Sequence, residues 1–177
     1  MELEELDLNT LKNGTPGITP EFGSCLAQAA SVCLEDQGHS TGVVMKIDGD
    51  FKTSFSVSWE PTTEQTRRCW GDKEVTTENG AYGCAIILIL RLTKHTVIQR
   101  SCKGTGFDFW LGDPDSTEPL FQGKSRLEVS GIRKGDQNTI RSRIRGKINQ
   151  VGRFNSTLPA IIIVVEFSEP SSRIENR

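Results

Sequence analysis

The sequence predicts an α/β fold in which a mixed central β-sheet is flanked by helices. Apolar residues spaced three to four positions apart, as in helices, alternate along the chain with short runs rich in β-branched and aromatic residues. Residues 160–167, Ala-Ile-Ile-Ile-Val-Val-Glu-Phe, form an apolar run without alternation, which indicates a central strand covered on both faces. With 177 residues the chain is long enough to build one domain around a substantial core.

Three regions are expected along the chain. Residues 1–17 show no sustained periodicity and end in Asn-Gly-Thr-Pro-Gly, so we expect a flexible acidic leader. Residues 18–168 are expected to form a single α/β domain, with its core in about residues 72–167. Residues 169–177 are expected to form a flexible tail.

The first half of the domain should contain a helix and a β-hairpin. Thr19 is a good N-cap and Pro20 a good first-turn residue, so a helix should run from there to about Gly38. Two strands, 43–47 and 51–59, flank an Asp-Gly-Asp turn, and the second alternates apolar and polar residues.

The second half should contain two helices and four strands. A helix capped by Asp72 or Thr77 should run to about residue 92, and because residues 84–90 are apolar all round it should be buried on most sides. Three strands should follow, over 96–100, 106–111 and 127–132, with a start near Phe121 as the alternative for the last. After Gly135-Asp136 a helix of about 16 residues, with a narrow stripe of Ile and Val, should precede the strand 160–167.

Charge is unevenly distributed, although the net charge is only −2. Residues 1–50 hold nine acidic and two basic residues, whereas residues 121–153 hold nine basic and two acidic residues. A basic block suits a polyanionic partner such as nucleic acid, and a solvated surface explains it equally well.

Other features exclude several classes of protein. No run of about 18 apolar residues is present and the first eight residues do not resemble a signal peptide, so we expect a cytoplasmic protein without a membrane partner. The five cysteines are odd in number and contain no Cys-x-x-Cys pair, which argues against a disulfide framework or a zinc site.

Two carboxylates lie on strands that a hairpin would make neighbours: Asp108 in 106–111 and Glu128 in 127–132. Two carboxylates within about 4 Å repel each other by roughly 4 kcal/mol at an effective dielectric constant near 20. A hard divalent cation removes this penalty and prefers oxygen ligands, so the pair predicts a rigid cation site. Glu78, in the preceding helix, is a third acid. Each of the three also has an ordinary structural explanation: backbone hydrogen bonds for Asp108, an Arg partner for Glu128, and a first-turn position for Glu78.

Between residues 72 and 167 the expected order is helix, strand, strand, strand, helix, strand, with an Asp on the second strand and a Glu on the third. This arrangement resembles the PD-(D/E)xK nuclease superfamily, whose restriction-endonuclease-like αβββαβ core would here follow an N-terminal helix and a β-hairpin. The resemblance implies that Asp108 and Glu128 bind Mg²⁺ or Mn²⁺. It further implies that the Val129 carbonyl is another oxygen ligand and that Glu78 is an additional acid from the helix.

The chain departs from the family pattern at two positions. Ser130 stands where the family has a lysine, and Phe107 rather than a proline precedes Asp108. Lys124, or else Lys103, is the candidate for the missing cation. The expected catalytic set is Asp108, Glu128, Lys124 and Ser130, and the expected nucleic-acid contacts are Lys103, Arg126, Arg141, Arg143 and Arg145.

The resemblance implies a metal-dependent nuclease-like domain that acts on nucleic-acid phosphodiesters, DNA first of all, in genome defence or repair. A homodimer is compatible with this function, because cutting both strands needs two sites. The alternative is a catalytically inactive module of the same fold that binds nucleic acid or a protein partner, for which Ser130 argues. A third reading is a small regulatory protein whose acidic N-terminal half docks a basic partner.

Overall fold

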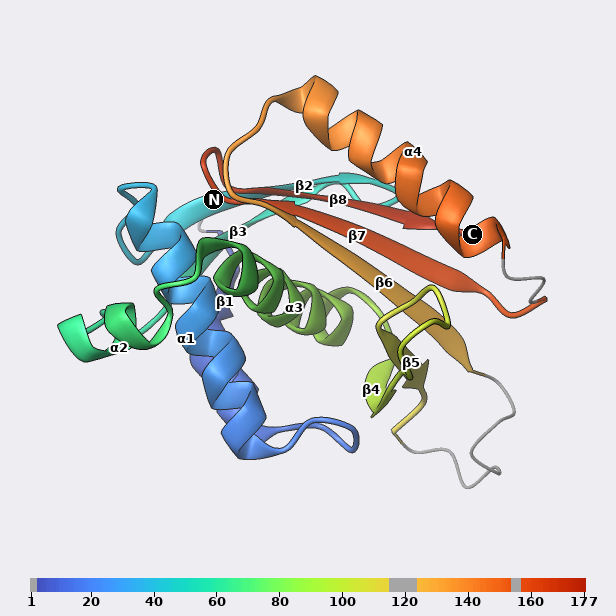
Figure 1. The fold of residues 1–177 in the computed structure, drawn as a ribbon, viewed down its shortest axis with the longest axis horizontal. Helices are drawn as coiled ribbons and strands as arrows, with labels where there is room; N and C mark the ends of the chain where they lie inside the picture. Colours follow the sequence, from blue (N-terminus) through green and yellow to red (C-terminus); the bar gives the residue numbers. More distant parts are fainter. Residues whose placement is uncertain (1–2, 115–123, 154–156) are drawn as a thin grey trace.

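A computed structural model describes residues 3–114, 124–153 and 157–177 (Figure 1). An eight-stranded mixed sheet crosses the molecule, with α1 (Pro20–Asp36) and α3 (Lys73–Leu92) on one face and α4 (Gln137–Arg153) on the other. The strands lie in the order β1-β3-β2-β8-β7-β6-β5-β4. Their bounds are β1 Glu5–Asp7, β2 Val43–Gly49, β3 Thr53–Ser58, β4 Thr96–Arg100, β5 Phe109–Gly112, β6 Ser125–Ile132, β7 Ala160–Glu166 and β8 Ser171–Asn176. The expected α/β fold with a mixed sheet flanked by helices is confirmed.

The first helix and the hairpin form where the sequence places them. The Thr19 side chain accepts a hydrogen bond from the Phe22 backbone N–H, and Pro20 occupies the first turn, so α1 begins there. Strands β2 and β3 pair antiparallel, with Met45 opposite Phe55 in the buried face of the hairpin. A short helix, α2 (Glu64–Cys69), then leads to α3.

The N-terminal segment differs from the expected flexible leader. Residues 5–7 form β1, which pairs parallel to β3, and a 3₁₀ helix, η1 (Leu8–Asn13), follows it. Leu6, Leu8 and Leu11 are at most 3% exposed and belong to the main core. A three-residue strand and a 3₁₀ turn are too short to produce a sequence period, although their leucines are needed to complete the core.

The C-terminal segment also differs from the expected flexible tail. Residues 171–176 form β8, which lies inside the sheet between β2 and β7. Only Ile174 in this strand is a large apolar residue, and it is buried. Its neighbours in the sheet come from distant parts of the chain, so the local sequence gives little sign of a central strand.

From α3 to β7 the observed element order is the expected one. The Asp72 carboxylate accepts hydrogen bonds from the backbone N–H groups of Glu74 and Val75, so Asp72 caps α3. Strands β4, β5 and β6 pair antiparallel, and α4 connects β6 to the parallel strand β7.

Two apolar cores lie on the two faces of the sheet. The main core joins α1, η1 and α3 to one face, and a smaller core packs α4 onto the other through Ile140, Ile144 and Val151. All seven residues of β7 are buried, which confirms the expected central strand. Within the described ranges, no helix combines the length and apolarity needed to cross a membrane.

Candidate functional site

Asp108 lies at the point where β5 separates from β6. It immediately precedes β5, and Phe109 with Leu127 is the last residue pair of the two strands on this side. The Asp108 backbone N–H still donates to the Leu127 carbonyl (2.9 Å), while its carboxylate Oδ2 accepts the Val129 N–H (2.8 Å). The side chain therefore takes the place that a continuing strand would have at the edge of β6.

The Val129 carbonyl points toward the same gap. In a β-strand the N–H and C=O of one residue point to the same side, and the Val129 N–H points toward Asp108. This orientation leaves a backbone oxygen at the open edge of β6.

Glu128 is buried beneath α4 and is 2% exposed. Its Oε1 accepts hydrogen bonds from Lys147 Nζ (2.5 Å) and Gln150 Nε2 (3.2 Å), both from α4. Gln150 Nε2 also lies 3.3 Å from the Gly106 carbonyl, so it ties the loop before Asp108 to the same helix. The ammonium that accompanies the acids thus comes from a helix.

The carboxyl groups of Asp108 and Glu128 lie close enough for each to influence the ionisation of the other. Burial raises the pKa of both, and the neighbouring Asp108 contributes to raising the pKa of Glu128 to about 7, which Lys147 partly opposes. Burial and the neighbouring negative charge of Asp108 both disfavour the ionised form of Glu128.

The donor set fits a divalent cation such as Mg²⁺ or Mn²⁺. Asp108 and Glu128 supply hard carboxylate oxygens, the Val129 carbonyl points toward the same gap, and a cation would offset the repulsion between the two acids. Among residues 3–114, 124–153 and 157–177, no group of three or more His, Cys, Asp or Glu side chains is placed to hold a metal, so these two acids would need water or substrate as further ligands.

Glu78 and Tyr82 approach the acids from α3. The Tyr82 hydroxyl lies 2.9 Å from Asp108 Oδ1 and 3.0 Å from Glu78 Oε1. Glu78 itself is exposed. It lies in the second turn of α3, where the side chain reaches the rim of the site; contact with the main core is made further along the helix.

A close approach of α3 to β6 brings these side chains to the site. A Cβ atom on Gly131 would lie 2.6 Å from the Thr77 carbonyl oxygen and 3.0 Å from the Ala81 side chain. Only glycine leaves room for the helix at this point of the strand.

Lys124 does not lie beside the acids. Its ammonium is 5.9 Å from the centre of the Trp110 ring, and four strand residues, about 13 Å, separate it from Glu128. The contacts described for Asp108 and Glu128 involve Lys147 instead. The choice of Lys124 as the cation at the acids is therefore corrected to Lys147, and Lys103 lies exposed in the preceding loop.

Ser130 and Arg126 have structural roles that the sequence did not reveal. Arg143 Nη1 donates to Ser130 Oγ (2.7 Å), so Ser130 holds an arginine side chain. Arg126 is 5% exposed and donates to the carbonyls of Val151 (3.3 Å) and Leu158 (2.8 Å). Because Arg126 is buried and two of its guanidinium nitrogens donate to backbone carbonyls, it does not lie on the surface where a nucleic-acid contact was expected.

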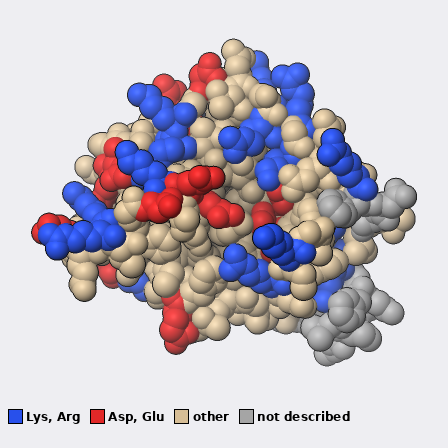
Figure 2. Space-filling model, in the orientation of Figure 1, with Lys and Arg blue, Asp and Glu red and all other residues tan. Residues whose placement is uncertain are grey.

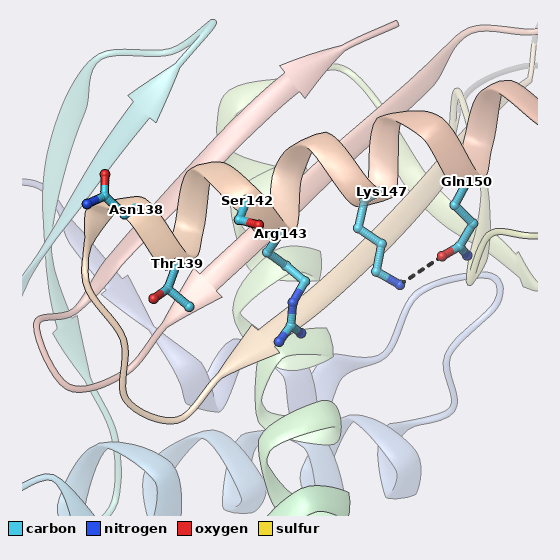
Figure 3. Close-up of a pocket in the computed structure, with 7 residues that line it drawn as sticks. Asn138, Thr139, Ser142, Arg143, Lys147 and Gln150 are labelled. Atoms are coloured by element: carbon cyan, nitrogen blue, oxygen red, sulfur yellow. Dashed lines mark hydrogen bonds between the residues drawn. The ribbon is translucent and has the colours of Figure 1, made fainter.

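The remaining arginines divide between two faces of α4. At 100° per residue, Arg141 and Arg145 lie about 200° away from Arg143, so these two exposed side chains point away from the acids. Arg143, Lys147 and Gln150 lie on one face of the helix and point the same way (Figure 3).

An open cleft of about 620 Å³ lies between α3, β6 and α4, and Arg143 and Lys147 line it. In Figure 2, acidic side chains near α3 face basic side chains near α4 across a hollow in the surface. The lining comes from three elements: Lys73, Glu74, Thr77, Glu78 and Tyr82 from α3, Val129, Ser130 and Gly131 from β6, and Arg143 and Lys147 from α4, with Arg133 beyond the strand.

Lys147, Gln150 and Tyr82 were missed by sequence reasoning. The available signal was spacing: Lys147 and Gln150 follow Arg143 by four and seven positions, which places them on one helical face, and Tyr82 follows Glu78 by four. Comparison with protein-family models, curated proteins and solved structures gives no match to this chain.

Proposed function

We propose that this protein is a metal-dependent nuclease-like domain that hydrolyses phosphodiesters of nucleic acid, with DNA as its substrate. The observation that carries the proposal is the meeting of Asp108 and Glu128 at the open edge of β6, with the Lys147 ammonium on Glu128. A divalent cation there would offset the repulsion between the half-buried Asp108 and the buried Glu128.

Some residues of the site would bind the cation, and others would stabilise negative charge on the substrate. Mg²⁺ or Mn²⁺ held by Asp108 and Glu128 supplies a Lewis acid for a phosphodiester oxygen. The Lys147 ammonium lies beside the acids, where it would stabilise the negative charge that develops on the phosphate of the nucleic acid during cleavage. Arg143 faces the cleft, where it would bind a phosphate of the nucleic-acid backbone.

The alternative is an inactive module that binds nucleic acid through the same cleft. Ser130 favours it, since this residue carries no charge at the position where the nuclease family has a lysine, and its hydroxyl accepts a hydrogen bond from Arg143. Such a module would bind nucleic acid in a salt-dependent way and without any requirement for a divalent cation.

The test is cleavage of single- and double-stranded DNA with Mg²⁺ or Mn²⁺ by the wild type, Asp108→Asn and Lys147→Met. Both variants should lose most of the cleavage, Asp108→Asn because a cation ligand is gone and Lys147→Met because the positive charge is gone. Arg145→Met is the matched control, because this exposed side chain lies on the opposite face of the same helix.

Calorimetric Mn²⁺ binding separates the outcomes. Wild type and Lys147→Met should bind Mn²⁺, and Asp108→Asn should not. Cleavage that survives in Asp108→Asn would contradict the proposal, and DNA binding with neither cleavage nor Mn²⁺ binding would favour the inactive module.

A further inference from the structure

Tyr82 is the only tyrosine in the chain, and its hydroxyl lies between two carboxylates. The residue is 5% exposed, so water does not compete freely for the hydroxyl. Burial, with the charges of Asp108 and Glu78, raises the pKa of Tyr82, and the hydroxyl therefore keeps the proton it donates.

The ring is held by the same elements that hold the acids. It packs edge to face against Phe109, with 5.1 Å between ring centres, and the Arg100 guanidinium lies 6.0 Å from its centre. Phe109 directly follows Asp108, so the contact fixes the hydroxyl relative to the Asp108 backbone. The hydroxyl thus approaches Asp108 from a fixed direction.

Both oxygens of the Asp108 carboxylate are engaged by such fixed donors. Oδ2 accepts the Val129 N–H at 2.8 Å, and Oδ1 accepts the Tyr82 hydroxyl at 2.9 Å. Each oxygen of an ionised carboxylate has about two acceptor positions, so one on each remains for a cation. The two donors leave the carboxylate little freedom to rotate.

Glu78 reaches this system through Tyr82. It is exposed, and its described contact in the site is the Tyr82 hydroxyl rather than Asp108 or Glu128. A hydroxyl has one hydrogen and can donate it to either acid, so Glu78 keeps the hydroxyl partnered when a cation withdraws charge from Asp108.

We propose that Tyr82 is a positioning residue that orients the Asp108 carboxylate for a divalent cation, and that Glu78 acts through Tyr82 rather than as a cation ligand. The inference rests on the proposed function, because it assumes that Asp108 binds the cation. It assigns to one hydroxyl the role that outer partners of metal ligands commonly have, which is to hold the ligand in its binding geometry.

Calorimetric titration with Mn²⁺ tests the inference directly. Removing an outer partner typically weakens metal affinity about 10- to 100-fold, so Tyr82→Phe should bind Mn²⁺ about 10-fold more weakly than the wild type. Asp108→Asn should lose binding, and Glu78→Gln should bind nearly as the wild type does. Thr76→Val is the matched control: it removes another buried hydroxyl of α3, which bonds the Trp70 and Asp72 carbonyls, and should leave Mn²⁺ affinity unchanged.

A spectroscopic readout distinguishes positioning from a merely structural role. With ¹³C-labelled tyrosine the protein gives one ring signal, since the chain has one tyrosine. Mg²⁺ should shift this signal in the wild type and in Glu78→Gln, and should not shift it in Asp108→Asn.

The outcomes separate the two proposals. Wild-type Mn²⁺ affinity in Tyr82→Phe, with binding lost in Asp108→Asn, would overturn the role of Tyr82 and leave the proposed function intact. A loss in Glu78→Gln as large as that in Asp108→Asn would make Glu78 a ligand and overturn its part of the inference. A wild type that binds no Mn²⁺ would overturn the proposed function, and this inference with it.

Discussion

Replacing Glu128 with Gln should change how the stability of the protein depends on pH. The Glu128 carboxyl is 2% exposed, and burial together with the adjacent Asp108 raises its pKa from 4.5 to about 7. Lys147 lowers this pKa only in part. In the unfolded chain the carboxyl is solvated and has its ordinary pKa, so folding and ionisation are linked.

The sign and size of the effect follow from this linkage. A carboxyl whose pKa is raised by folding contributes stability that is fully present below pH 4.5 and is lost as the pH rises through about 7. At about 1.4 kcal/mol for each pH unit, a rise from 4.5 to about 7 corresponds to about 3 kcal/mol. The free energy of unfolding of the wild type, relative to Glu128→Gln, should therefore fall by about this amount across the interval.

Urea unfolding between pH 4.5 and 8 with a chelator present measures this difference. Glu35→Gln is the control, because hydrogen bonds from Thr62 and other neighbours overcome the burial of Glu35 and hold its pKa at about 2. The contribution of Glu35 is lost only as the pH falls below 4.5, so this variant should parallel the wild type over most of the range. Parallel curves for Glu128→Gln and the wild type would refute the reasoning. Saturating Mg²⁺ should restore stability at pH 8 in the wild type alone.

Two further substitutions test the packing around the site by urea unfolding. Gly131→Ala should destabilise the protein by about 1–3 kcal/mol because its Cβ would collide with α3, whereas Gly146→Ala, where the space is open, should stabilise α4 by up to about 1 kcal/mol. Arg126→Met should cost about 1–3 kcal/mol because the hydrogen bonds from this buried guanidinium to the Val151 and Leu158 carbonyls are lost, while Arg141→Met on the exposed face should change stability by less than about 0.5 kcal/mol. Equal effects within either pair would contradict the geometry.

Local signals were enough to predict most of the elements. Thr19 and Pro20 mark the start of α1 because capping is decided by neighbouring residues, and the unbroken apolar run of β7 shows burial on both faces. Strand β8 was missed because its position depends on pairing with β2 and β7, and its own residues are mostly polar. The leucines of β1 and η1 were missed for a related reason, since they fill a core built by other elements.

The part of the site that depends on strand pairing, the proximity of Asp108 and Glu128, could be predicted from the sequence. Asp108 and Glu128 meet because β5 and β6 pair in sequence order, and the sequence shows that order. The partner lysine depends on how α4 is rotated on the sheet, and the sequence offered Lys124 on the same strand as a nearer choice. Arg126 was assigned to the surface because nothing in its local sequence shows that α4 covers that end of β6.

Because Lys147 is carried by a helix, its charge reaches the acids only while α4 stays packed on the sheet. That packing depends on the smaller core, in which Ile144 is 5% exposed and precedes Lys147 by three residues. Ile144→Ala should cost about 2–5 kcal/mol and should also loosen the contact between Lys147 and Glu128. Because Lys147 lowers the pKa of Glu128, the midpoint of the pH-dependent stability loss should move above 7 in this variant.

Leu34→Ala in the main core should destabilise the protein by a similar amount and leave that midpoint unchanged, since Leu34 lies in α1 on the other face of the sheet. A shift of the midpoint in both variants would mean that any loss of core packing changes the pKa of Glu128. A shift in Ile144→Ala alone would mean that packing of the smaller core controls the pKa of Glu128. The position of α4 would then determine whether the Lys147 ammonium stays beside the two acids, although α4 contributes neither acid.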